Sequence, residues 1–248
     1  MTLLVVSESP EPVQNEPAGL IRVSELGIGK LCAGKRHAQF ERGLHGNGPA
    51  VTLEPRHNLP MPLPEFRPAR VEPIAPPYSP EIQTVFDKIM PPGIAPLALF
   101  TTLARVPRVY DRLRAGSLLD HGPVSLHYRE VVIDRTCARC GCAYEWGVHV
   151  AFFADRAKLN SEQVRATFRG DPTDPAWTDE ERLLIKLVDE LHDTAGISDE
   201  LWNALYAAFQ IEEIFELIAL VGFYHTISFF ANGLRLANEP YAVLPPDE

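Results

Sequence analysis

Apolar residues fall at helical spacing in the second half of the chain, most clearly between residues 178 and 196. Thr178 is followed three residues later by Glu181, an arrangement typical of a capping box at the start of a helix. The apolar positions after it are Leu183, Leu184, Leu187, Val188 and Leu191. Their spacing predicts an amphipathic helix, which Gly196 is expected to end.

Three further segments carry helix signals. Residues 79–81, Ser-Pro-Glu, combine a capping hydroxyl, a proline at the first helical position and an acid in the first turn. Ile197 and Trp202 are spaced to form a hydrophobic staple at the start of the next helix, and another helix is predicted over about residues 211–236. No useful length of sequence alternates as a strand does, and no glycine-rich phosphate loop occurs. The pattern therefore predicts an all-α helical bundle.

One apolar stretch has the minimum length of a membrane span. No charged residue occurs between Leu217 and Leu234, but Tyr224, His225 and Asn232 lie within the stretch. Such polar groups would be costly in lipid and are ordinary in a buried helix of a bundle or an oligomer. We therefore expect a buried helix and no membrane partner.

Proline separates the first part of the chain from the rest. Sixteen of the 23 prolines precede residue 97, and residues 60–80 are helix-breaking, extended sequence. We therefore expect a Pro-rich, irregular N-terminal extension over residues 1–75 and a helical domain over residues 76–248. The extension is either a loose tail, or the result of a translation start assigned too far upstream, or an arm that wraps a neighbouring subunit. The sequence leaves these alternatives open.

Charge and cysteine content narrow the class of protein. The formal net charge is −10 and no basic cluster occurs, which argues against a nucleic-acid partner. Three of the four cysteines fall within six residues, a pattern that does not suit the disulfides of a secreted fold. Together with the lack of an N-terminal secretion signal, this predicts a reducing, cytoplasmic location.

The residues that carry chemistry gather between Glu130 and His149. If a helix starts near Cys142, then Cys142, Glu145 and His149 share one of its faces. Gly141 can interrupt the preceding helix, so that the helix of Glu130 packs beside that of His149. A thiol, an imidazole and two carboxylates would then meet, which suits proton transfer or nucleophile activation.

This spacing resembles the Glu, Cys-x-x-Cys, His motif of the alkylhydroperoxidase D (AhpD)-like proteins within the carboxymuconolactone decarboxylase family. The resemblance implies that Glu130 and His149 form a proton relay and that Cys142 is the first cysteine of the motif. Glu145 stands where the peroxide-attacking second cysteine would be. A carboxylate cannot form a disulfide, so the redox cycle of the motif itself is blocked.

Two longer segments, residues 139–149 and 221–232, are similar to a branch of this family that commonly carries glutamate at the second cysteine position. The resemblance extends over about residues 78–248. It implies an all-α AhpD-like fold, a trimer or hexamer, a small-molecule substrate, no metal or organic cofactor, and a pocket lined by Tyr144, Trp146 and His225.

The cysteines allow two interpretations. Cys137 and Cys140 form a second CxxC near arginines and could supply redox chemistry in place of the blocked motif. Free cysteines are also often small buried apolar residues, and this is the favoured interpretation for Cys137. Three cysteines and a histidine could in principle bind zinc, but the single residue between Cys140 and Cys142 is poor ligand spacing, so no metal is predicted.

The other candidate residues have structural alternatives. Glu145 could pair with an arginine, and His149 could be a hydrogen-bonded core histidine. Tyr224 and His225 are interpreted first as helix-packing residues and second as pocket residues. The remaining His121, His127 and His192 look like surface or loop residues.

Three functional hypotheses follow. The leading one is a peroxidase-like oxidoreductase with a Cys/Glu/His site. The second is a cofactor-independent acid–base enzyme, for example a decarboxylase or an enzyme of lactone or keto-acid chemistry, that uses Glu130, Glu145 and His149. The third is a non-catalytic oligomeric ligand-binding protein.

Overall fold

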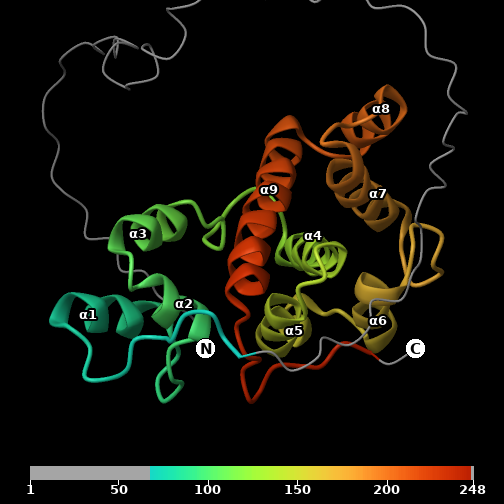
Figure 1. The fold of residues 1–248 in the computed structure, drawn as a ribbon. Coiled ribbons are helices and arrows are strands. Elements are labelled where there is room, and N and C mark those ends of the chain that lie inside the picture. Colours follow the sequence, from blue (N-terminus) through green and yellow to red (C-terminus); the bar gives the residue numbers. More distant parts are fainter. Residues whose placement is uncertain (1–67, 247–248) are drawn as a thin grey trace, which may run out of the picture. The chain divides into compact units, whose positions relative to one another are not determined.

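A computed structural model describes residues 68–246 of the 248-residue chain (Figure 1). These residues form α-helices joined by loops and contain no β-strand. The prediction of an all-α fold is therefore confirmed. Most of the predicted extension over residues 1–75, including Cys32, lies outside the described residues, and residues 68–79 precede the first helix.

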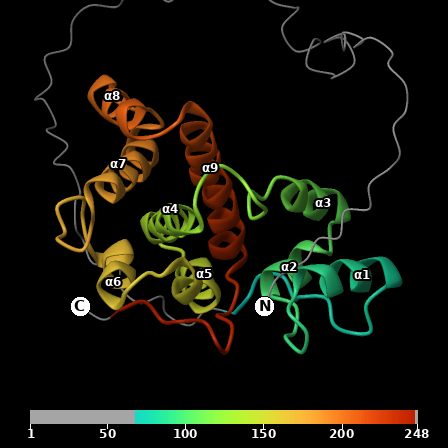
Figure 2. The ribbon, with the colours of Figure 1, turned by 180° about the vertical axis from the view of Figure 1, so that it is seen from behind.

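The helices differ widely in length, and the last is the longest. In chain order they are α1 (Pro80–Ile89), α2 (Ala98–Leu103), α3 (Pro107–Ala115), α4 (Leu126–Arg139), α5 (Ala143–Ala157), α6 (Ser161–Arg169), α7 (Asp179–Thr194), α8 (Asp199–Ala208) and α9 (Ile211–Leu234). Figures 1 and 2 show α4 with α5, α7 and α9 around it, and α1 to α3 on the far side of α9.

The predicted helix starts agree with the structure. The Ser79 side chain accepts a hydrogen bond from the backbone N–H of Ile82 at the start of α1. Thr178 and Glu181 form the expected capping box of α7. The end of α7 differs from the prediction, because Ala195 and not Gly196 has the left-handed conformation, with φ = 54°.

Helix α4 is the centre of the core. Every residue from Arg129 to Cys137 is buried, and the helix packs against α5, α6, α7 and α9. Arg135 donates two hydrogen bonds, at 2.9 and 2.8 Å, to the Asp189 carboxylate of α7. A helix this deeply buried carries its polar side chains into the interior, where each needs a partner.

A tight turn joins α4 to α5 at Gly141. This residue has φ = 60°, in the left-handed region that glycine adopts without a steric penalty. The backbone N–H of Cys142 donates to the carbonyl of Cys137 at 2.8 Å, and α5 begins at the next residue. The turn folds α5 back against α4, so the sequence on either side of Gly141 meets across the helix interface.

Helix α9 is long and apolar enough to cross a membrane by length and composition, with a mean hydropathy of 1.7. In the structure it packs against α4, α5, α7 and α8, and 44% of its most apolar window is buried inside the domain. Its buried polar residues are Tyr224 and Ser228. Its exposed aromatic residues are Phe215 and Phe229.

Candidate functional site

The His149 imidazole on α5 is the centre of a buried polar network. Its Nδ1 atom lies 2.7 Å from Oε2 of Glu130 on α4, and its Nε2 atom lies 3.1 Å from the hydroxyl of Tyr224 on α9. The Nε2 atom is also 3.5 Å from Oε1 of Glu145, one turn earlier on α5. All four residues are buried. Three helices therefore meet at one imidazole.

The carboxylates determine the charge of this imidazole. Burial alone would lower the pKa of His149, but the charges and hydrogen bonds of Glu130 and Glu145 outweigh burial and raise the pKa to about 10. The protonated ring donates from Nδ1 to Glu130, and its Nε2–H faces Tyr224 and Glu145. Burial, followed by the charges of Glu145 and Glu130, raises the pKa of Tyr224 well above its ordinary value, so its hydroxyl keeps its proton.

The two glutamates of the network differ in how fully they are bonded. Glu130 uses one oxygen for His149 and the other for Arg129, whose Nε–H donates to Oε1 at 3.3 Å. Glu145 has a buried Oε2 atom without a hydrogen-bond partner among the described residues. An unpaired buried carboxylate oxygen is costly to maintain. Of the two glutamates, Glu145 therefore has the oxygen that is available to a further proton or ligand.

One aromatic contact links the network to the surface. Phe153, one turn after His149 on α5, lies with its ring 5.2 Å from the imidazole. It is half-buried, whereas Glu130, Glu145 and Tyr224 are buried. Phe153 is therefore a partly exposed side chain in ring contact with His149.

Asp134 belongs to the same cluster and was not recognised in the sequence. It is only 1% exposed, and neither carboxylate oxygen has a hydrogen-bond partner within residues 68–246. Burial, followed by the charge of Glu130, raises the pKa of Asp134 well above its ordinary value, which favours the neutral acid. The available signal was its position one turn after Glu130 on the same face of α4.

Glu130, Asp134 and His149 each offer a ligand atom within 4.8 Å of the others. The atoms of Glu130 and His149 are already joined by their hydrogen bond. The arrangement as it stands suits movement of a proton along Glu130, His149 and Tyr224.

The three described cysteines are free thiols. Cys142 and Cys137 are fully buried, and Cys140 is half-buried. Burial is the main cause that raises the pKa of all three thiols, to about 12 for Cys142. Cys142 precedes α5 directly and lies near enough to Glu145 for that charge to raise its pKa further. The thiolate is therefore disfavoured at each of these positions.

Within residues 68–246, no hydrogen bond or ring contact joins His149 to Tyr144, Trp146 or His225. The Tyr144 hydroxyl donates to Glu239 at 2.7 Å and accepts from the backbone N–H of Leu99. The Trp146 indole N–H donates to Thr167 on α6 at 2.9 Å. These two side chains, which were predicted to line a pocket, connect α5 to the C-terminal segment and to other helices.

Two of the histidines predicted to be on the surface have specific partners. His127 is on α4, half-buried, and its ring nitrogens contact the carbonyl oxygen of Ala157 and the carboxylate of Glu181. His192 is on α7, half-buried, with its Nδ1 atom 3.0 Å from Nε2 of His225 on α9. Both side chains are partly exposed but lie on helices and not in loops, and their contacts with other helices were not predicted, because a helical pattern does not show which polar face meets another helix. His121 is exposed in a loop, as predicted.

Two surface hollows lie apart from the network. One, of about 340 Å³, is lined by residues of α7 and α8. The other, of about 320 Å³, is lined by the end of α1 and the loop after it. Neither is lined by Glu130, Glu145 or His149.

The fold has well-defined counterparts among known proteins. Residues 104–188 match the model of the carboxymuconolactone decarboxylase family, a span that contains Glu130, Glu145 and His149. A search of curated proteins found no match. The described domain has an all-α AhpD-like fold, as its similarity to solved structures shows.

Three of these structures illustrate the similarity. A peroxidase-related protein from Silicibacter sp. TM1040 is 16% identical, with a TM-score of 0.59 over 71% of this chain and 95% of its own. The AhpD core of a peroxidase-related protein from Ralstonia eutropha JMP134 is 19% identical, with a TM-score of 0.56 over 64% and 84%. A variant of the debrominase Bmp8 in complex with 2,3,4-tribromopyrrole is 16% identical, with a TM-score of 0.56 over 69% and 92%.

Proposed function

We propose that the protein is a cofactor-independent acid–base enzyme that acts on a small carbonyl compound. The single observation that carries this proposal is the buried chain Glu130–His149–Tyr224 beside the unpaired Oε2 atom of Glu145. It places the Tyr224 hydroxyl, as a hydrogen-bond donor, and the Glu145 carboxylate, as a proton acceptor, beside the same nitrogen of one charged imidazole. Proton removal next to a carbonyl group needs these two functions together.

Each residue has a role in this chemistry. Glu145 accepts a proton from the carbon next to the carbonyl group. The Tyr224 hydroxyl, polarised by the His149 imidazolium, donates a hydrogen bond to the oxygen that becomes negative. Glu130 keeps the imidazole protonated and oriented, and Arg129 keeps Glu130 in place. The same donors would stabilise the enolate left by loss of carbon dioxide from a β-keto acid, which then takes a proton from solvent.

The closed environment supports the proposal. In a buried site, charge stabilisation by fixed donors is stronger than in water. Glu130, Glu145, His149 and Tyr224 are all buried, so the proposed donors and acceptor are shielded from water.

The test uses the full chain and two small probes. Enolisable ketones in D₂O report proton exchange by NMR, and acetoacetate reports release of carbon dioxide. We expect Glu145→Gln and His149→Ala to lower the rate by at least about 100-fold, which is typical for loss of an acid–base group. The matched control is Glu162→Gln, an exposed glutamate on α6. Equal rates in Glu145→Gln, His149→Ala and wild-type protein would refute the proposal.

A thiol-dependent peroxidase is the second candidate. The observation that favours it is Cys140, the half-buried thiol among the three described, in a fold shared with proteins named as peroxidase-related. This candidate predicts turnover of cumene hydroperoxide with dithiothreitol, and loss of that turnover in Cys140→Ser. Unchanged peroxide turnover in Cys140→Ser and Cys142→Ser would exclude it.

A further inference from the structure

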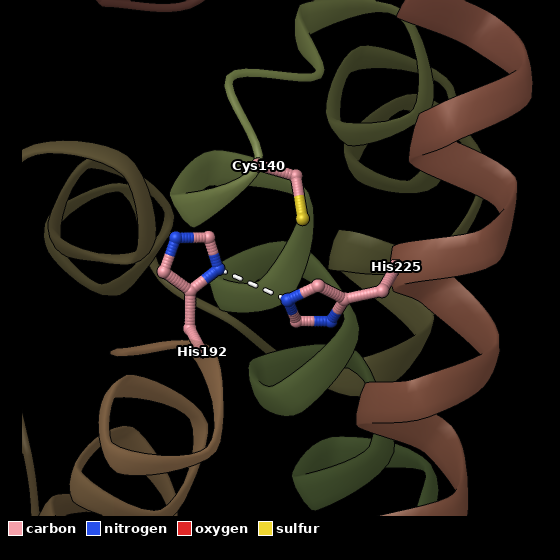
Figure 3. Close-up of side chains that lie close together, drawn as sticks. All are labelled: Cys140, His192 and His225. Atoms are coloured by element: carbon pink, nitrogen blue, oxygen red, sulfur yellow. Dashed lines mark hydrogen bonds between the residues drawn. The ribbon is translucent and has the colours of Figure 1, made fainter. Parts of the chain in front are cut away.

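A second polar cluster lies where the end of α4 meets α7 and α9. Cys140, His192 and His225 point toward one another in Figure 3, and each contributes one atom to a group in which all three lie within 4.8 Å of each other. All three side chains are half-buried. The cluster uses none of the atoms that form the network around His149.

A backbone contact fixes the orientation of one imidazole. The Nδ1 atom of His225 lies 2.8 Å from the carbonyl oxygen of Val221. A carbonyl only accepts, so Nδ1 carries the hydrogen, and the lone pair on Nε2 accepts a hydrogen bond from Nδ1–H of His192. That Nε2 atom faces His192 and Cys140 (Figure 3). Metal-binding histidines characteristically donate their other N–H to a carbonyl or a carboxylate in this way.

The spacing of the two imidazole nitrogens is close to that of a metal site. In a tetrahedral zinc site, Zn–N bonds of about 2.0–2.1 Å separate two nitrogens by about 3.3 Å. Nδ1 of His192 and Nε2 of His225 are 3.0 Å apart. Small rotations of the half-buried side chains, which move the two nitrogens apart by a few tenths of an ångström, would therefore admit an ion.

The surrounding charges are compatible with a cation. Arg139 is the positive group beside the cluster, and its guanidinium is paired with Asp189 and Asp193, at 3.4 and 2.6 Å. Asp193 offsets its charge, and Asp189 is shared between Arg139 and Arg135. A cysteine thiolate would further offset the charge of a divalent ion.

We propose that Cys140, His192 and His225 bind a divalent transition-metal ion of the zinc class, with a fourth coordination position open to water. One thiolate and two imidazoles are ligands that suit such ions. Binding forms one metal–sulfur and two metal–nitrogen bonds. It releases the thiol proton to solvent, and the hydrogen on Nδ1 of His192 moves to the Nε2 atom of the same ring, so that both imidazoles bind as neutral ligands. This site is independent of the acid–base function proposed above.

The test is metal binding to the full chain without an affinity tag. The protein carries Cys32→Ser, so that a thiol outside the described residues does not compete, and is first dialysed against a chelator. Cobalt(II) is added as the probe, because a cobalt–thiolate bond produces charge-transfer absorption in the near ultraviolet. Zinc is then added to displace cobalt, and zinc binding is measured by calorimetry.

We expect one cobalt ion per chain with charge-transfer absorption, displaced by one equivalent of zinc. Cys140→Ser should abolish this absorption. Cys140→Ser or His192→Ala should each weaken zinc binding by at least about 100-fold, because loss of even a residue that only hydrogen-bonds to a metal ligand lowers metal affinity by about 10–100-fold. His121→Asn, which changes an exposed loop histidine, should bind as the parent does.

Several results would overturn the proposal. The first is absence of stoichiometric binding, and the second is charge-transfer absorption that persists in Cys140→Ser. A third test, the thermal unfolding midpoint, uses the parent chain with all three proposed ligand residues in place. Zinc should raise the thermal unfolding midpoint of the parent chain, because an ion that binds only the folded state stabilises it. An unchanged midpoint at saturating zinc would contradict the assignment.

Discussion

Replacement of Glu130 by glutamine tests whether the buried imidazole is charged. The substitution keeps the size of the side chain but removes the carboxylate that lies 2.7 Å from His149. Removal of one partner of a buried ion pair costs about 3–5 kcal/mol, because the other charge stays buried without compensation. We therefore expect Glu130→Gln to lower the free energy of unfolding by about this amount at pH 6.

The loss should depend on pH in a defined direction. In the folded protein the pKa of His149 is raised from 6.5 to about 10. Its stabilising effect is therefore complete below pH 6.5 and decreases as pH rises toward 10. The slope is at most about 1.4 kcal/mol per pH unit. In Glu130→Gln the main cause of the raised pKa is absent, so the difference between the two proteins should shrink by about 2–3 kcal/mol between pH 6.5 and 8.5.

The assay is urea unfolding of both proteins at half-unit steps from pH 6 to 9. Glu162→Gln is the control, since an exposed glutamate should change stability by less than about 0.5 kcal/mol at every pH. A difference between Glu130→Gln and wild-type protein that stays constant from pH 6.5 to 8.5 would refute the charged imidazole. So would a difference that grows with pH.

Three further predictions concern contacts of the core. Tyr224→Phe removes the hydroxyl that faces His149. It should lower the unfolding free energy by about 1.5–3 kcal/mol in urea titrations. Equal stability of Tyr224→Phe and wild-type protein would show that this hydrogen bond contributes nothing. Gly147→Ala places a Cβ atom 2.3 Å from the carbonyl oxygen of Val243 and should cost about 1–3 kcal/mol of stability in thermal unfolding. Gly222→Ala meets nothing within 4 Å and should stabilise α9 by up to about 1 kcal/mol. A Gly147→Ala protein more stable than the Gly222→Ala protein would contradict the packing described. Arg135→Leu leaves Asp189 without its bidentate partner and should cost about 3 kcal/mol of stability in thermal unfolding. A loss of less than about 1 kcal/mol would show that the pair behaves like an exposed ion pair.

Local sequence signals predicted much of the fold. Capping residues such as Ser79 and Thr178 act within one helical turn, so their effect can be deduced from neighbouring residues alone. The same holds for Gly141, whose left-handed backbone ends α4 and returns the chain along it. In a helix, the spacing of residues determines the face on which each side chain lies. The approach of Glu130 to His149 could therefore also be predicted from the sequence. Their catalytic roles stay predictions.

Contacts between distant segments could not be deduced in this way. Tyr224 reaches His149 from a helix 75 residues further along the chain, and the apolar pattern of α9 does not show which of its faces meets α5. Tyr144 contacts Glu239 of the C-terminal segment, 95 residues away. The cluster of Cys140, His192 and His225 likewise has no motif, because Cys140 directly follows α4 and the two histidines lie on α7 and α9. Assembly into a trimer or hexamer also stays a prediction.

The most direct measurement for the proposed site is the protonation state of His149 in the wild-type chain. Nitrogen-15 NMR of the imidazole ring, assigned by comparison with His149→Gln, reports this state at each pH. Because Glu130 and Glu145 raise the pKa of this imidazole, both ring nitrogens should carry protons at pH 8. A ring that loses its proton near pH 6.5, the ordinary value for histidine, would contradict the charged relay at the centre of the proposed mechanism.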